Sequence, residues 1–270
     1  MTPAPLLVAD SVTKLGPEAR GAVLVAGSHG GVYAAYLAAA AGLRGVVLND
    51  AGIGLGQAGI AGLAYLDGLG IAAATVGHLT ARIGDGRDMM ARGRLSRVNE
   101  AAHRLGCAPA MRCAEAGERL REAPLAATAP PPYEEARILL RHEAGEPPVW
   151  GLDSNALVRP EDAGAVIITG SHGGLLGGRP ETAIRVAALA AVYNDAGIGI
   201  DEAGMSRLPA LDARGIAGAT VAAASARIGE ARSSWETGRL SAVNATARAW
   251  GAAVGMSVPD FARLACRRRR

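Results

Sequence analysis

The chain is 270 residues long, half of its residues are apolar, and its formal net charge is +3. This length can bury a full hydrophobic core, as one large domain or as two domains of ordinary size. Aromatic residues make up only 3% of the chain and glycine occurs 37 times, which favours helices packed closely on a sheet and argues against a small all-β sandwich with aromatic anchors.

The first half of the chain predicts strands that alternate with helices. Apolar, β-branched runs indicate buried strands, and apolar residues at helical spacing indicate the helices. In chain order we expect a strand at 22–26, a helix at 32–41, a strand at 45–48, a helix at 57–69, a strand at 71–76, a short helix at 85–92 and a helix at 96–105 that Ser96 caps. Strands joined in this way form parallel βαβ units, so the expected fold is Rossmann-like.

The second half of the chain repeats the first. Residues 21–31 (GAVLVAGSHGG) match residues 164–174 (GAVIITGSHGG), and LNDAGIG, ARIGDGR and GRLSRVN recur as YNDAGIG, ARIGEAR and GRLSAVN. The offset between the copies grows by two residues after the first match, which predicts a small insertion at 175–180. We therefore expect an α/β fold of two tandem Rossmann-like βαβαβ repeats with parallel sheets, related by a pseudo-two-fold axis and built from the same elements.

A proline-rich stretch separates the two copies. Residues 1–122 form the expected first repeat, and residues 151–270 form the second, which ends in a basic tail at 267–270. Residues 123–150 contain the clusters APPPYEE and GEPPVW, which are typical of an extended linker, around one short helix expected at 133–142.

Several classes of protein and site are excluded by composition. Lys14 is the only lysine among 28 basic residues, which indicates the codon usage of a GC-rich, bacterial genome rather than nucleic-acid binding. The three cysteines form no CxxC pair, so neither a disulfide nor a metal site is expected. No signal peptide and no membrane-spanning stretch is evident. We therefore expect a cytoplasmic protein that binds a small-molecule ligand and has no cofactor and no nucleic-acid or membrane partner. Both a monomer and a homo-oligomer are compatible with the sequence.

Three turns occur in both copies, and each follows a predicted strand. Because ligands bind at the carboxyl ends of parallel strands, we expect these turns to meet at one edge of the sheet. The glycine-rich turn can hold an anion on its free N–H groups, or it can serve only close packing. The candidate ligand-binding residues in the two copies are Gly30, Gly31, Asn49, Arg82, Gly173, Gly174, Asn194 and Arg227.

Histidines at matched positions indicate acid–base chemistry. Of five histidines, only His29 and His172 are equivalent between the copies, and imidazole transfers protons near neutral pH. The expected catalytic residues are these histidines with the adjacent serines and the aspartates of the second turn, namely His29, His172, Ser28, Ser171, Asp50 and Asp195. Because adjacent side chains rarely align, a serine nucleophile would need help from another segment.

Each candidate also has a structural interpretation. Asp50 can orient the imidazole, and Asn49 can bind a ligand carbonyl. Alternatively, either side chain can cap the backbone of its own turn. Arg82 and Arg227 can clamp a carboxylate or phosphate, or they can form ion pairs with Asp85 and Glu230. Helix capping explains the remaining matched polar residues better than function does: Ser96, Asn99, Ser241 and Asn244.

The Ser-His-Gly-Gly turn followed by a strand ending in Asp-Ala-Gly resembles the active-site arrangement of caspase-like cysteine peptidases. In that family a histidine in the first turn acts as the base, and a cysteine at the second turn is the nucleophile. Here Gly52 and Gly197 stand where the cysteine would be needed, which rules out that chemistry.

The pattern as a whole predicts an enzyme that acts on a small, polar, anionic metabolite. His29 or His172 would be the general acid or base, Asp50 and Asp195 would orient it, and an arginine would hold the anion. Hydrolase, lyase or isomerase chemistry fits better than redox chemistry because no dinucleotide-binding fingerprint is visible. The alternative is a non-catalytic binding or sensor protein that uses the same glycine-rich turns.

Overall fold

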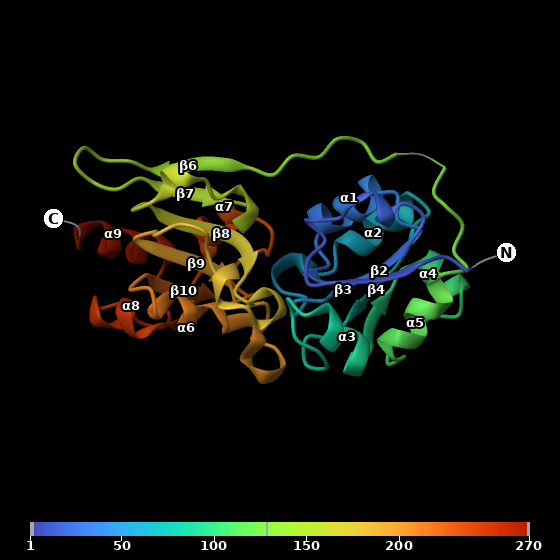
Figure 1. Cartoon of the computed structure of the whole chain (residues 1–270). Coiled ribbons are helices and arrows are strands. Elements are labelled where there is room, and N and C mark those ends of the chain that lie inside the picture. The colour runs from blue at the N-terminus through green and yellow to red at the C-terminus, as the bar shows by residue number, and fades with distance from the viewer. Residues whose placement is uncertain (1–2, 128, 269–270) are drawn as a thin grey trace. The chain divides into compact units, whose positions relative to one another are not determined.

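The computed structural model describes residues 3–127 and 129–268, and the chain divides into two compact α/β units (Figure 1). The first unit takes most of the chain before residue 135, and the second takes most of the chain from there on. Each unit consists of a mostly parallel sheet with helical segments on both faces, consistent with two tandem Rossmann-like units. Among the described residues, no helix has the length and apolar character needed to cross a membrane.

The sheet of the first unit has five strands in sequence order, β1-β2-β3-β4-β5. Their bounds are β1 (Leu6–Ala9), β2 (Val23–His29), β3 (Gly45–Asn49), β4 (Ala72–Val76) and β5 (Leu95–Val98). The first four strands run parallel and β5 runs antiparallel to β4. The middle strands are buried on both faces, which explains why they are almost continuously apolar.

Two helical layers cover this sheet. One layer holds α1 (Val32–Ala40) and α2 (Gly62–Gly68), and the other holds α3 (Gly86–Arg92), α4 (Glu100–Arg104) and α5 (Cys113–Leu120). Short 3₁₀ turns lie in the connections, η1 (Pro17–Ala19) and η2 (Leu55–Gln57). The alanine-rich helices allow close approach to the valine-rich strands, so the two faces form separate cores on either side of the sheet.

The second unit repeats this sheet with one more strand, in the order β11-β10-β9-β8-β7-β6. The strands are β6 (Arg137–Arg141), β7 (Val149–Leu152), β8 (Val166–His172), β9 (Ala190–Asn194), β10 (Ala217–Val221) and β11 (Leu240–Val243). Strands β7 to β10 are parallel, whereas β6 and β11 are antiparallel edge strands.

The helical layers of the second unit differ from those of the first. The α-helices are α6 (Arg207–Asp212), α7 (Ala231–Thr237), α8 (Ala245–Ala249) and α9 (Val258–Arg267). Residues 173–189, all of which are described, contain no α-helix between β8 and β9, although α1 occupies this place in the first unit. Two 3₁₀ turns take its place, η5 (Leu176–Gly178) and η6 (Pro180–Thr182). Other connections of the second unit contain the 3₁₀ turns η3 (Asn155–Leu157), η4 (Pro160–Asp162) and η7 (Ile200–Met205). The expectation that both copies contain the same elements is therefore wrong at this helix.

The helix expected at 133–142 is also wrong, because its core is strand β6. This strand pairs with β7, with Arg137 opposite Leu152 and Leu139 opposite Trp150. A segment this short is marginal as an isolated helix, whereas pairing with the open edge of β7 satisfies its backbone groups. At the other end of the unit, Arg267 closes α9, and residues 269–270 of the expected basic tail lie outside the described part of the chain.

Asparagine rather than serine caps the helix after the fifth strand. Ser96 lies within β5, and its hydroxyl is 3.1 Å from that of Thr75 on β4. The cap of α4 is Asn99, whose side chain accepts a hydrogen bond from Ala102 N. Asn244 caps α8 in the same way, so the capping interpretation holds for both asparagines and is wrong for Ser96 and Ser241. The helix expected at 57–69 begins later than expected, at Gly62.

A glycine in β2 allows the loop after β4 to cross directly over the strand. A Cβ added at Gly27 would lie 2.4 Å from Asp85 N and 2.8 Å from Asp10 O. The equivalent Gly170 in the second unit is 2.5 Å from Glu230 N by the same measure. No side chain fits at either place, so glycine at this position is a requirement of backbone packing.

We expect Gly27→Ala to lower the free energy of unfolding by about 2–3 kcal/mol, because the added methyl group overlaps backbone atoms that cannot move independently. Gly68→Ala is the matched control, since a Cβ there meets nothing within 4 Å and alanine favours the helix in which it lies. The control should raise stability by about 0.5–1 kcal/mol. Urea denaturation measures both changes, and equal effects would contradict the packing argument.

Candidate functional site

The three repeated turns of the first unit meet at one edge of its sheet, as expected. Gly30 N donates to Asn49 O at 2.7 Å, which joins the first turn to the second. Gly84 N donates to Gly27 O at 2.8 Å, which joins the third turn to the first. The second unit has the equivalent bonds, Gly173–Asn194 and Gly229–Gly170, both at 2.7 Å.

The glycine-rich turn is filled by the protein's own backbone. Besides the bond from Gly30 N, Gly31 N donates to His29 Nδ1 at 3.1 Å, so two amides that could hold an anion have internal partners. A Cβ at Gly30 would lie 2.6 Å from Gly59 O, which places another loop where a ligand would approach. These contacts favour the packing interpretation of the glycines, and ligand binding by Gly30, Gly31, Gly173 and Gly174 stays a prediction.

The asparagines of the second turn tie two turns together. Asn49 is fully buried, its Oδ1 accepts from Ala51 N at 2.9 Å, and its Nδ2 donates to Ala81 O at 3.3 Å. Asn194 makes the same two bonds, to Ala196 N and to Ala226 O. These bonds give both asparagines a structural role at the sheet edge.

The serines before the histidines hold a neighbouring loop. Ser28 Oγ accepts a hydrogen bond from Val12 N at 3.0 Å, and Ser171 Oγ accepts one from Asn155 N at 2.8 Å. Each hydroxyl therefore fastens a loop, the one after β1 in the first unit and the one after β7 in the second. In these contacts the partner of each serine hydroxyl is a backbone N–H group, which cannot act as a base. A role for either serine as a nucleophile remains a prediction.

Both arginines of the third turn form ion pairs. Arg227 Nε is 2.7 Å from Glu230, as the structural interpretation predicts. Arg82 pairs with Asp88 at 3.9 Å and with Asp201 at 2.9 Å, both assigned to the first unit, instead of with Asp85. Asp85 caps α3 by accepting from Asp88 N. An anionic ligand would have to compete with these carboxylates.

The matched histidines share one local bond. His29 Nδ1 accepts from Gly31 N, and His172 Nδ1 accepts from Gly174 N at 3.2 Å. An amide N–H can only donate, so the proton of a neutral His29 ring is on Nε2. Burial lowers the pKa of His29 to about 4, which keeps the ring neutral at pH 7. His29 is therefore a hydrogen-bond donor through Nε2, and neither of its nitrogens has a free lone pair with which to accept a proton.

Asp50 binds a different histidine, His78, which is not among the residues expected from the sequence. Asp50 Oδ1 accepts from Gly52 N at 3.1 Å, from His78 N at 2.9 Å and from His78 Nδ1 at 2.9 Å. The carboxylate side chain is 4% exposed, while the imidazole is 23% exposed. Burial would raise the pKa of Asp50, but the hydrogen bonds from His78, with help from the Ser96 hydroxyl, hold that pKa below its ordinary value. The expected pair of Asp50 with His29 is thus replaced by a pair of Asp50 with His78.

The second unit has the same turn without the imidazole. Asp195 Oδ1 accepts from Gly197 N at 2.9 Å and from Ala223 N at 2.8 Å, and Ala223 stands at the position of His78. Matching between the copies selects His29 and His172 and misses His78. In the sequence His78 lies 28 positions from Asp50, and His103 is unmatched as well, so no local signal marks His78.

Stability should depend on pH through His29. The pKa of His29 is about 4 in the folded protein and about 6.5 in the unfolded chain. Between these two pH values the ring is protonated in the unfolded chain and neutral in the folded protein. The free energy of unfolding therefore falls as the pH drops through this range. His29→Asn keeps an acceptor for Gly31 N and removes the titration. Between pH 7 and pH 4.5 the variant should lose about 1–2 kcal/mol less than wild type in urea denaturation.

The exposed His103 provides the control for this measurement. His103→Asn should lose as much stability as wild type over the same pH range. If His29→Asn also behaves like wild type, the partly buried neutral imidazole of His29 is not the cause of the acid sensitivity.

The edge of the first unit therefore carries a buried carboxylate bonded to a partly exposed imidazole, above a framework of internally satisfied turns. Comparison of the chain with protein-family models, with curated proteins and with solved structures finds no match. What this site can do follows from its own geometry.

Proposed function

We propose that the protein is an enzyme that performs acid–base chemistry on a small polar metabolite, with His78 as the general base and Asp50 as the residue that orients it. The observation that carries this proposal is the 2.9 Å bond between His78 Nδ1 and Asp50 Oδ1 at the carboxyl edge of the sheet. A buried carboxylate that fixes the ring and stabilises its protonated form is a recurring part of histidine-based catalysis.

The hydrogen-bond partners determine which nitrogen is reactive. An ionised carboxylate only accepts, so Nδ1 of His78 must carry a proton, and the neutral ring keeps its free lone pair on Nε2. His29 has the opposite arrangement, since its Nδ1 accepts from the backbone. His78 is therefore suited to remove a proton, whereas His29 is suited only to donate a hydrogen bond.

The second copy supports a chemical role for His78. Asp195 holds its turn with two backbone N–H groups and has Ala223 beside it, so the fold does not need an imidazole at this position. The ring of His78 is thus free to serve another purpose. Its placement in one unit only predicts a single active site in the chain.

Hydrolase, lyase or isomerase chemistry remains the proposed class. The anionic character of the substrate rests on Arg82 and Arg227, which carboxylates already neutralise, so we propose a polar substrate without requiring a charge. The alternative, a non-catalytic protein that holds its ligand on the glycine-rich turns, has less support because the amides of Gly30 and Gly31 have internal partners.

Hydrolysis of p-nitrophenyl acetate tests the proposed base. His78 would take a proton from the attacking water, releasing acetate and p-nitrophenol. His78→Ala, which copies Ala223, should fold normally and lose about 100-fold in rate, and Asp50→Asn should lose less. His103→Ala, which removes an exposed imidazole, is the control and should retain the wild-type rate. Equal rates for His78→Ala and wild type would contradict the proposal.

A further inference from the structure

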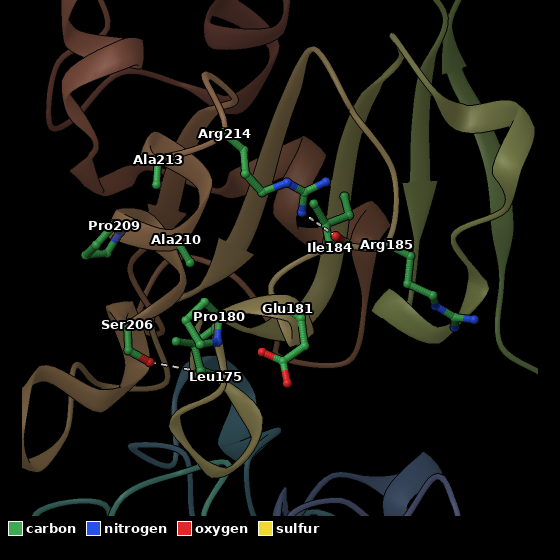
Figure 2. Close-up of a pocket in the computed structure, with 10 residues that line it drawn as sticks. All are labelled: Leu175, Pro180, Glu181, Ile184, Arg185, Ser206, Pro209, Ala210, Ala213 and Arg214. Carbon is green, nitrogen blue, oxygen red and sulfur yellow. Dashed lines mark hydrogen bonds between the residues drawn. The ribbon is translucent and has the colours of Figure 1, made fainter.

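The second unit contains a cavity of about 760 Å³, whereas the proposed base belongs to the first unit (Figure 2). Leu175 and Ile184, on the segment after β8, form one wall. Pro209 and Ala210, on α6, form the opposite wall. This volume is within the usual range for small-molecule sites, which are mostly apolar with a few polar groups.

The cavity exists because the second unit lacks what fills the same region of the first. There, α1 packs beside α2, and the partly buried Tyr65 on α2 packs against the core on that face. At the position equivalent to Tyr65 the second unit has Ala210, and 3₁₀ turns replace α1. The missing helix and the missing phenol ring leave a hollow of apolar character above α6.

A buried arginine fastens one wall of the hollow. Arg207 is 3% exposed, and its Nε donates to His172 O at 3.2 Å and to Gly174 O at 3.1 Å. Its Nη1 donates to the carbonyls of Thr182 and Ala183. The guanidinium therefore holds the segment after β8 at its start and near its middle.

The first unit shows why this arginine fits only here. Its equivalent is Gly62, where a Cβ would lie 2.7 Å from Gly30 O and 2.8 Å from the Cβ of Ala35 on α1. Without α1 the space opens, and Arg207 enters it with its guanidinium 4.9 Å from the centre of the Tyr193 ring. The Tyr193 hydroxyl adds a bond to Ala183 O at 2.8 Å.

Further bonds hold the same wall open. Arg214 donates to Ile184 O, and Leu175 N donates to Ser206 Oγ at 2.9 Å (Figure 2). Arg214 also donates to Val186 O at 2.7 Å. These bonds link α6 and its flanking residues to the segment after β8 across the hollow. The walls are therefore formed before any ligand arrives, which reduces the entropy that binding would cost.

We propose that this cavity binds a small aromatic carboxylate. The ring would occupy the apolar space that Tyr65 and α1 fill in the first unit. Arg185 and Arg214 line the cavity against one acidic residue, Glu181, so its charged residues sum to a positive charge. The described partners of the buried Arg207 are carbonyl groups and the Tyr193 ring, so its charge adds to the positive potential. An anionic group on the ligand is favoured over a neutral or cationic one.

A matched ligand series tests the class of molecule. Titration of the full chain with 2-naphthaleneacetate, followed by the ligand's fluorescence, should give saturable binding. The neutral 2-naphthaleneethanol should bind about 5–10-fold more weakly, and the cationic 2-naphthaleneethylamine should be the weakest. Added salt should weaken binding of the acid and leave binding of the alcohol unchanged. No binding of the acid, or tighter binding of the amine, would overturn the proposal.

A substitution that restores the residue of the first unit tests the place. Ala210→Tyr should fill the hollow and weaken binding of 2-naphthaleneacetate by at least about 10-fold. Ala249→Tyr adds the same ring to an exposed position of α8 and should leave binding unchanged. Thermal melting checks that each variant is folded, and Ala213→Phe fills the cavity from the end of α6 if Ala210→Tyr does not fold.

Other occupants have distinct outcomes. Unchanged affinity in Ala210→Tyr and Ala213→Phe would place the acid elsewhere and overturn the proposal. A wild-type dimer that Ala210→Tyr converts to a monomer in size-exclusion chromatography would identify a second copy of the chain as the occupant, and would overturn it as well. Binding is independent of the proposed catalytic pair, so His78→Ala should retain it.

Discussion

A buried carboxylate that joins two strand ends is the constraint on which both units depend. Asp50 in the first unit and Asp195 in the second accept an amide of their own turn and the amide of the second residue after the next parallel strand. Both aspartates are buried, so the energy of leaving these donors unpaired would be large. The same edge of each sheet contains close backbone contacts at Gly27 and Gly170. It also contains a buried asparagine that bonds to the third turn, Asn49 in the first unit and Asn194 in the second. Because these groups bind one another, the repeated motifs form a rigid platform on which other residues act.

The duplication separates residues that the fold needs from residues that it does not. Matched polar groups such as His29 and His172 have matched backbone partners, which is the expected result when a residue is retained for the geometry of a turn. His78 has no match, and its pairing with Asp50 adds a charge-assisted bond to a turn that is stable without it. The proposed catalytic function therefore rests on a difference between the copies.

The proposed ligand cavity follows from a second difference, the loss of α1 in the second unit. A missing helix would normally leave a collapsed or unstable surface, because loops carry backbone groups that need partners. Arg207 meets this need by donating to several carbonyls from a buried position, which glycine occupies in the first unit. Burial lowers the pKa of Arg207, but this does not remove its charge, since arginine stays protonated in proteins. The hollow is thus a stable part of the unit.

Sequence patterns were enough to predict the duplication, the α/β class, the parallel strands and the meeting of three turns at one edge, because strand periodicity and repeated motifs are local properties of the chain. It also indicated that Asn99 and Asn244 cap helices. The pairing of residues 137–141 as a strand followed from three-dimensional packing, since β-pairing depends on which edge lies open beside the segment. The partner of Asp50 did so too, because a hydrogen bond between residues 28 positions apart has no signature in local sequence. Gly177, Gly178 and Pro180 disfavour a helix in the segment after β8, but whether a hollow then remains beside Ala210 depends on how the neighbouring elements pack.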